Sequence, residues 1–419
     1  MTRRAILHIG TEKTGTTALQ MAFRRDAERL ATLGVRYPDF RMLNHAALAF
    51  AAADNAAGVQ DLGPHIGLLP GETRADFVKR LHGWLESETS AYPEARFVFS
   101  TEHAQSRLTS AAAVERVKAI LCEHFDEIEI AVYLRRWDRM ALSYHATAVR
   151  NGATARFSFN RYAKSPLLDY PGLLDRWAQV FGAEHVHVRV FDRATLTNGS
   201  ILDDFAACFE LPSLGPVADQ NVAIDAGGQD LLRLLDRAME GHADGERVAV
   251  REAVVAAIRP DPHATPPVTR AEARQFVESF ADAELALRKR WFPERAALFD
   301  DRFDDYPEVP TSARRNWRDL SVVLVDAVLA SADRENGARA ESRYYRALAH
   351  KRAGRLALAE TEIREAIGFR PGIAGYWLVL ADLLQALERP ADARGAIEAA
   401  LAIEPDNADF RRVAASLRT

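Results

Sequence analysis

Short apolar runs alternate with helical stripes of apolar residues along the first two hundred positions of the chain. Four of these runs predict buried strands, over Ala5–Ile9, Arg96–Ser100, Glu129–Leu134 and His185–Phe191. Helical spacing follows three of them, over Thr16–Leu33, Trp137–Arg150 and Ile201–Leu211. Strands that alternate with helices predict an α/β fold, in which helices cover both faces of a parallel sheet.

The pattern becomes mostly helical from Asp225 to about Leu298. A proline-rich loop, Pro260–Pro267, interrupts it. We therefore expect a helical extension of the first domain, over about residues 221–300.

A boundary is expected where Pro307 and Pro310 bracket a polar turn. The first domain then covers residues 1–310. A connecting helix is expected over 311–339, and a small all-α domain over 340–419.

The last segment contains an internal repeat. A shift of 34 residues superposes Ala359 on Ala393, Ile363 on Ile397, Ala366 on Ala400 and Pro371 on Pro405. This period, with small residues in the second helix and a closing proline, resembles the tetratricopeptide repeat. If this segment were an ordinary helical bundle, the four matches at one offset would have to arise by chance.

We expect two repeats over Ala340–Asn407 and a capping helix after them. Because three repeats are usual, the preceding helix or a second subunit is expected to supply a further surface.

Composition narrows the possible functions. The 419 residues include 54 Lys and Arg against 59 Asp and Glu, a net charge of −5, so bulk charge gives no support for nucleic-acid binding. Any site that binds an anion must therefore depend on a local group of residues and not on the net charge of the chain. Two distant cysteines, Cys122 and Cys208, indicate neither a disulfide framework nor a metal cluster. No apolar stretch predicts a signal peptide or a membrane span, so we expect a cytoplasmic protein.

The strongest chemical signal is the turn between the first predicted strand and helix, with the sequence GTEKTGTT over Gly10–Thr17. Backbone N–H groups at a helix start point at an anion, and the helix dipole favours negative charge there. Gly10 and Gly15 allow a tight turn, and Lys13 adds a positive charge. Hydroxyl donors come from Thr14, Thr16 and Thr17. The turn therefore predicts a phosphate-binding loop.

This loop differs from that of the nucleoside triphosphatases, which reads G-x-x-x-x-G-K-[ST]. Gly10 and Gly15 have the required spacing, but Thr16 stands where the lysine belongs and Lys13 lies inside the loop. The arrangement that couples this lysine to magnesium is absent, which argues against a nucleotide kinase.

A second anion-binding pair follows the third predicted strand. Arg135 comes at the carboxyl end of this strand, where open parallel sheets bind ligands. Ser143 lies eight residues later, about two helical turns along the next helix. A guanidinium with a nearby hydroxyl suits a phosphate monoester.

Together these motifs resemble the sulfotransferases that use 3′-phosphoadenosine 5′-phosphosulfate. Lys13–Thr17 resembles their 5′-phosphosulfate loop, and Arg135 with Ser143 resembles their 3′-phosphate motif. The stretch His187–Asp192, followed by Ile201–Phe205, is similar to the strand and helix that flank the adenine side.

The resemblance spans about Ala5–Tyr306 and stops before the repeats. Leu173–Trp177 is like bacterial carbohydrate sulfotransferases, and Arg136-Trp137 replaces a commoner pair of a polar residue and proline. The resemblance implies a P-loop-like sulfotransferase fold and sulfuryl transfer to a carbohydrate hydroxyl. The co-substrate would be 3′-phosphoadenosine 5′-phosphosulfate, with no metal.

The resemblance also implies roles for single residues. Lys13 would neutralise the leaving phosphate, and Phe191 would stack on the adenine. An acceptor hydroxyl also needs a general base. Glu102, just after the second predicted strand, stands nearly where related enzymes carry that base. His45, in a predicted loop after the first helix, is the other candidate.

A second hypothesis is a non-catalytic scaffold that keeps the nucleotide fold and works through its repeats. Under either hypothesis the repeats would bind a protein partner or the acceptor, or would associate with a second copy. The joint presence of Lys13, Arg135 and Ser143 favours the enzyme.

Overall fold

The computed structural model describes residues 2–40, 44–55, 57–217, 224, 226–239, 244–258, 266–309 and 336–417. The chain divides into two compact units, Met1–Arg237 with Arg259–Arg314, and Ala238–Ile258 with Arg315–Thr419. The helical extension expected over 221–300 is therefore split between the units instead of belonging wholly to the first. Most of the connecting helix expected over 311–339 lies outside the described residues.

The first unit is built on a parallel sheet of five strands, in the order β2-β3-β1-β4-β5. The strands are β1 (Arg4–His8), β2 (Val35–Arg36), β3 (Arg96–Ser100), β4 (Glu127–Leu134) and β5 (Val186–Val190). Four of them confirm predicted strands to within two residues at either end. The edge strand β2 was not predicted, because a two-residue strand is too short to carry a periodic signal.

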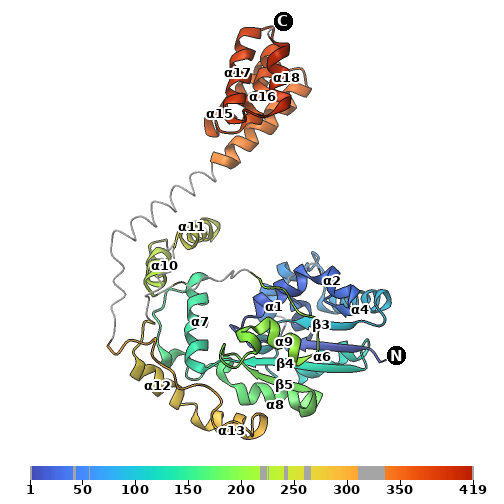
Figure 1. The fold of residues 1–419 in the computed structure, drawn as a ribbon, viewed down its shortest axis with the longest axis vertical. Helices are drawn as coiled ribbons and strands as arrows, with labels where there is room; N and C mark the ends of the chain where they lie inside the picture. Colours follow the sequence, from blue (N-terminus) through green and yellow to red (C-terminus); the bar gives the residue numbers. More distant parts are fainter. Residues whose placement is uncertain are drawn as a thin grey trace. The chain divides into compact units, whose positions relative to one another are not determined.

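Helices cover both faces of this sheet (Figure 1). The α-helices of the first part of the chain are α1 (Thr16–Arg25), α2 (Ala27–Thr32), α3 (Ala46–Ala52), α4 (Arg74–Ala91), α5 (His103–Arg107), α6 (Ala111–Cys122), α7 (Trp137–Arg150), α8 (Tyr170–Phe181), α9 (Ile201–Cys208), α10 (Ala226–Ala238), α11 (Asp244–Ala257), α12 (Arg270–Glu278) and α13 (Ala281–Trp291). Of these helices, α11 belongs to the second unit. Short 3₁₀ helices are η1 (Ala57–Ile66), η2 (Phe159–Arg161), η3 (Pro166–Leu168), η4 (Ala183–His185) and η5 (Thr197–Gly199). No helix in the described ranges is both long and apolar enough to cross a membrane.

Alternate residues of the strands enter two separate hydrophobic cores. In β4, Ile130 and Val132 join the core formed with α3, α4, α6 and α8. Ala131 and Tyr133 face the other way and pack with α1, α2 and α9. Because both faces are covered, the central strand β1 is apolar and buried over Ala5–Leu7, as its sequence predicts. The sheet thus holds the carboxyl ends of its strands in fixed register.

The start of α7 is held by a buried ionic cluster. Arg136 makes two hydrogen bonds of 2.8 Å to the Asp138 carboxylate and also donates to the carbonyl of Arg302 at 2.9 Å. The Tyr306 hydroxyl donates to Asp138 at 2.6 Å. The ring of Trp137 stacks on Phe280. This cluster fixes the backbone immediately after Arg135.

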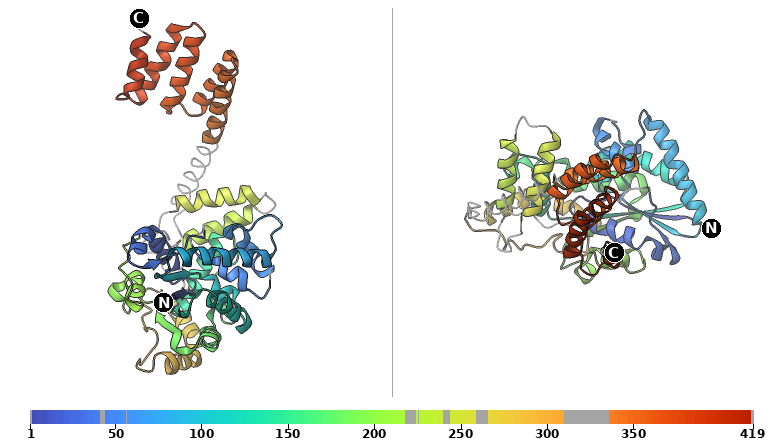
Figure 2. Two further views of the ribbon diagram at one scale, coloured as in Figure 1. Left: turned by 90° about the vertical axis from the view of Figure 1, so that its right-hand side faces the viewer. Right: turned by 90° about the horizontal axis from the view of Figure 1, so that it is seen from above.

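The second unit contains a repeated pair of helices, in orange and red in Figure 2. Besides α11, its helices are α15 (Leu356–Phe369), α16 (Ala374–Ala386), α17 (Pro390–Ile403) and α18 (Ala408–Ser416), after helical residues 336–352. Both α17 and α18 begin 34 residues after their counterparts α15 and α16 (390 − 356 and 408 − 374). The small and apolar residues superposed by the 34-residue shift are buried in one core, namely Ala359, Ile363, Ala366, Ala393, Ile397 and Ala400. Buried alanines let neighbouring helices approach closely.

Candidate functional site

Four neighbouring strands end at the same edge of the sheet, and each is followed by a predicted site residue. The loop Gly10–Gly15 follows β1, Glu102 follows β3, Arg135 follows β4 and Phe191 follows β5. The central strand β1 lies between β3 and β4. After β1 the chain forms β2 and β3 on one side of it, and then crosses to the other side to form β4 and β5. Ligands of open α/β sheets bind at such a point.

The loop begins as an extension of the sheet. The N–H of Thr11 donates to the carbonyl of Tyr133 at 3.0 Å, and the N–H of Tyr133 donates to Gly10 at 2.8 Å. The Thr11 hydroxyl also donates to Tyr133, and the Thr14 hydroxyl donates to the carbonyl of Thr11 at 2.6 Å. Thr14 is fully buried. Its hydroxyl proton is therefore used within the loop, which corrects the expectation that it donates to a phosphate.

Two residues of the loop have left-handed backbone conformations. Gly15 has φ = 79°, and a Cβ there would lie 3.2 Å from Ile201 and 3.3 Å from the ring of Phe191. Lys13 has φ = 62°, which is uncommon for a residue with a long side chain. Such strain is held only where the surrounding structure enforces it, and it concentrates at binding sites. Gly15 provides no side-chain cap, so the first N–H groups of α1 have no side-chain acceptor there.

Lys13 and Arg135 bring two positive charges to this loop. Arg135 Nη1 donates to the backbone carbonyl of Lys13 at 2.7 Å, and its guanidinium lies 5.7 Å from the ring centre of Phe191. Neither cation has a carboxylate at ion-pair distance among the described residues. Burial lowers the pKa of both side chains, and for Lys13 the nearby carboxylates act in the opposite sense. Two partly buried cations without ion pairs favour a bound anion.

Three hydroxyls expected to bind the anion remain available. Those of Thr16, Thr17 and Ser143 donate no hydrogen bond within the described residues. Burial, reinforced by the charge of Glu12, raises the pKa of Tyr144, which follows Ser143 in α7. This interaction indicates that α7 passes close to the loop Gly10–Gly15.

Glu102 lies against the start of the loop. A Cβ at Gly10 would lie 3.4 Å from the Glu102 Cα, and the Glu102 charge raises the pKa of Lys13. The side-chain amide of Gln20 donates to the Glu102 carboxylate at 2.7 Å. Asn44 Nδ2 approaches the other carboxylate oxygen at 3.5 Å. The carboxylate is thus oriented next to the loop lysine.

Sequence reasoning missed the amides that organise this site. Gln20 also donates to the Ser100 hydroxyl at 3.3 Å, and Ser100 hydrogen-bonds His8 Nδ1 at 2.9 Å. Gln105 accepts from the N–H of Glu12 at 2.7 Å and so ties the loop to α5. One signal in the sequence was a glutamine on the apolar face of the first helix, where Gln20 is buried.

His45 does not meet the requirements of a general base. The ring is buried, Nδ1 accepts from the N–H of Ser100 at 3.0 Å, and Nε2 is 3.0 Å from the carbonyl of Pro38. An Nδ1 that accepts leaves Nε2 as the donor to Pro38. Burial lowers the pKa of His45 to about 4, so the ring is neutral. Its only lone pair is occupied, and we assign it a structural role.

No family model, curated protein or solved structure matches this chain. The chemistry of the site must therefore be inferred from its geometry. It presents a helix start, two cations, free hydroxyls and one oriented carboxylate at a single edge of the sheet. This combination can bind a phosphate-bearing ligand and can accept a proton beside it.

The buried neutral histidine predicts a pH-dependent stability. Because its pKa is about 6.5 in the unfolded chain and about 4 in the folded one, unfolding takes up a proton between these values. The free energy of unfolding should therefore fall as pH decreases from 6.5 to 4. Replacing His45 by Gln should remove about 2 kcal/mol of the loss between pH 7 and pH 5, measured by urea denaturation. The exposed His65→Gln is the control, and an unchanged pH profile for His45→Gln would contradict this assignment.

Proposed function

We propose that this chain is a sulfotransferase that moves a sulfuryl group from 3′-phosphoadenosine 5′-phosphosulfate to a carbohydrate hydroxyl. The observation that carries the proposal is the hydrogen bond from Arg135 to the carbonyl of Lys13. It joins Arg135 to the backbone of Lys13 at the ends of adjacent strands, beside a helix start that lacks a side-chain cap. In the part of the chain that the structure describes, neither side chain has a carboxylate at ion-pair distance. A nucleotide with phosphates at both its 5′ and 3′ positions suits such a pair of anion subsites.

In this proposal the 5′-phosphosulfate binds the loop, and the 3′-phosphate binds the second cation. The first N–H groups of α1, with Lys13, Thr16 and Thr17, would hold the 5′ group. Arg135 and Ser143 would hold the 3′-phosphate, and Phe191 would stack on the adenine. The contact of Gly15 with Phe191 supports this arrangement, because it brings the ring beside the loop. The first unit would then have a P-loop-like sulfotransferase fold.

The reaction needs charge stabilisation and one proton acceptor. The acceptor oxygen attacks sulfur as the bond from sulfur to the bridging phosphate oxygen breaks, and the products are a sulfate ester and adenosine 3′,5′-bisphosphate. Lys13 would stabilise the negative charge that develops on the leaving phosphate. Glu102, oriented by Gln20, would take the hydroxyl proton. The buried, doubly hydrogen-bonded ring of His45 favours Glu102 over His45 as the base.

The second unit would consist of tetratricopeptide repeats. Its 34-residue helix pairs and buried alanines support this reading. The repeats would bind a protein partner or the carbohydrate acceptor, or would associate with a second copy of the chain.

The test is a transfer assay with the full-length chain. Donor nucleotide labelled in its sulfuryl group is incubated with a panel of polysaccharides and small glycans, and label in the acceptor is followed together with release of adenosine 3′,5′-bisphosphate. Equal amounts of both products support the proposal. Tight nucleotide binding without transfer to any acceptor would favour the scaffold instead.

Replacing Arg135 by Ala should weaken binding of adenosine 3′,5′-bisphosphate about ten- to hundredfold. A charge-assisted hydrogen bond contributes about 1.5–3 kcal/mol, which corresponds to that change in affinity. Calorimetric titration measures it. The matched control is Arg4→Ala, because Arg4 lies at the opposite end of the sheet, in an exposed pair with Glu127. Unchanged affinity in Arg135→Ala would refute the assignment of this residue.

Replacing Glu102 by Gln should lower kcat about a hundred- to ten-thousandfold, because glutamine keeps the shape and removes the basicity. Affinity for adenosine 3′,5′-bisphosphate should stay within about threefold of the wild-type value. His45→Gln is measured in parallel and should retain turnover. Near-normal turnover in Glu102→Gln, with loss in His45→Gln at unchanged stability, would reverse the choice of base.

A further inference from the structure

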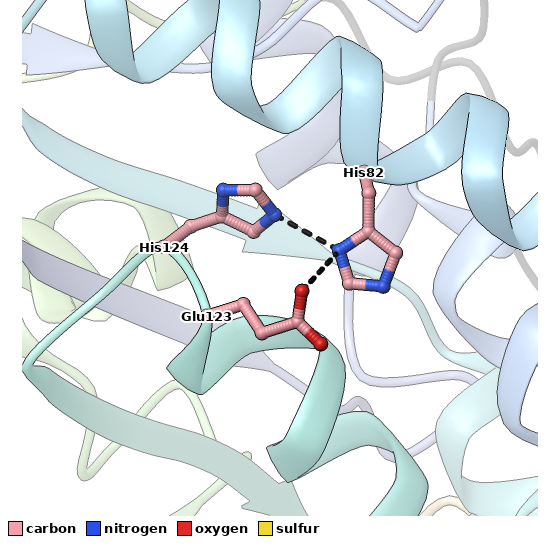
Figure 3. A group of neighbouring side chains, drawn as sticks. All are labelled: His82, Glu123 and His124. Atoms are coloured by element: carbon pink, nitrogen blue, oxygen red, sulfur yellow. Dashed lines mark hydrogen bonds and ion pairs between the residues drawn. The ribbon is translucent and has the colours of Figure 1, made fainter.

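A group of side chains that could ligate a metal ion lies away from the proposed nucleotide site. His82 comes from the middle of α4, and Glu123 and His124 follow the end of α6. Figure 3 shows the three side chains pointing toward one another. His82 Nδ1 lies 3.0 Å from His124 Nε2 and 3.3 Å from a carboxylate oxygen of Glu123. One ligand atom from each residue lies within 4.8 Å of the others.

This group belongs to the other end of the sheet. The chain passes from the end of α6, through Glu123 and His124, into the first residue of β4 at Glu127. The amino ends of the parallel strands lie at that edge, whereas the loop Gly10–Gly15 lies at the carboxyl ends. The group is therefore separate from the proposed nucleotide site.

The spacing of the donor atoms fits a tetrahedral metal. Zinc binds imidazole nitrogen at about 2.0–2.1 Å and carboxylate oxygen at about 2.0–2.2 Å, so neighbouring ligand atoms lie roughly 3.3 Å apart. The separations of 3.0 and 3.3 Å are close to this value. In a hydrogen bond between two neutral imidazoles, one facing nitrogen carries the proton and only the other offers a lone pair. Both facing nitrogens can bind a metal ion when each ring carries its proton on the other nitrogen. Two imidazoles with one carboxylate suit zinc and its neighbours better than magnesium or calcium.

Further charged side chains lie near this group. Glu86, one helical turn after His82 in α4, adds a second carboxylate that acts on His124, whereas Arg3 acts on His124 in the opposite sense.

We propose that His82, Glu123 and His124 form a binding site for a divalent transition-metal ion of the zinc class. Water would complete the coordination, since the three residues supply three ligand atoms. The ion would join α4 to the end of α6, two segments that are 42 residues apart at the histidines. Because the ion would bind the folded chain and not the unfolded one, it would raise the stability of the fold.

The test uses the full-length chain without a histidine tag, freed of metal by chelator and titrated with Zn²⁺ and, separately, Co²⁺. We expect one equivalent of Zn²⁺ to bind with a Kd in the micromolar range or below, and to raise the melting temperature. Co²⁺ should give the visible absorption of a tetrahedral nitrogen and oxygen site. His82→Gln and His124→Gln should each weaken binding at least about tenfold and abolish the rise in melting temperature.

The matched control is another pair of histidines that shares a carboxylate. His185 and His187 contact separate oxygens of Glu129 at 3.2 and 2.6 Å. His187→Gln should leave Zn²⁺ binding unchanged. If His82→Gln fails to fold, the exposed Glu123→Gln provides the test with the same expectation. No binding to the wild-type chain below millimolar Zn²⁺ would overturn the proposal, as would unchanged affinity in these variants or loss of binding in His187→Gln.

Discussion

The candidate site depends on one contact, the hydrogen bond of 2.7 Å from Arg135 to the backbone carbonyl of Lys13. It links the residue after β4 to the loop after β1, and the sheet holds both strands in register. On one side, the cluster of Arg136, Asp138 and Tyr306 fixes the chain that follows Arg135. On the other, the ladder of Thr11 with Tyr133 fixes the loop. A contact supported from both sides keeps its geometry when no ligand is bound.

The charge balance of the site follows from this arrangement. Burial disfavours the charged forms of Lys13 and Arg135, and neither is neutralised by an ion pair among the described residues. Glu102 lies near enough to act on Lys13, yet its carboxylate is held by Gln20 instead. A bound anion would relieve the unpaired charge on the cations and would leave the carboxylate available as a base. Under the proposed function, the same geometry would serve both anion binding and proton transfer.

Much of this arrangement could be predicted from the sequence, and the failures have physical causes. Buried strands such as β3 and a helix such as α7 produce strong local patterns, so their bounds agree with the prediction. Contacts that depend on tertiary structure leave no such pattern. Gln20 orients Glu102, which lies 82 residues further along the chain, so its role depends on the folded structure. The burial of His45 likewise depends on its hydrogen bond with the backbone of Ser100. Loop residues identified by type, such as Thr14, can equally serve the loop itself.

The most direct test of the central claim is a calorimetric titration of the full-length chain with three nucleotides, in which magnesium is added only with ATP. If Lys13 and Arg135 form two phosphate subsites, adenosine 3′,5′-bisphosphate should bind at least about tenfold more tightly than adenosine 5′-monophosphate, since it alone offers a second charged contact. ATP with magnesium should bind more weakly than the bisphosphate. Equal affinity for the bisphosphate and the monophosphate, or preference for ATP with magnesium, would contradict the account.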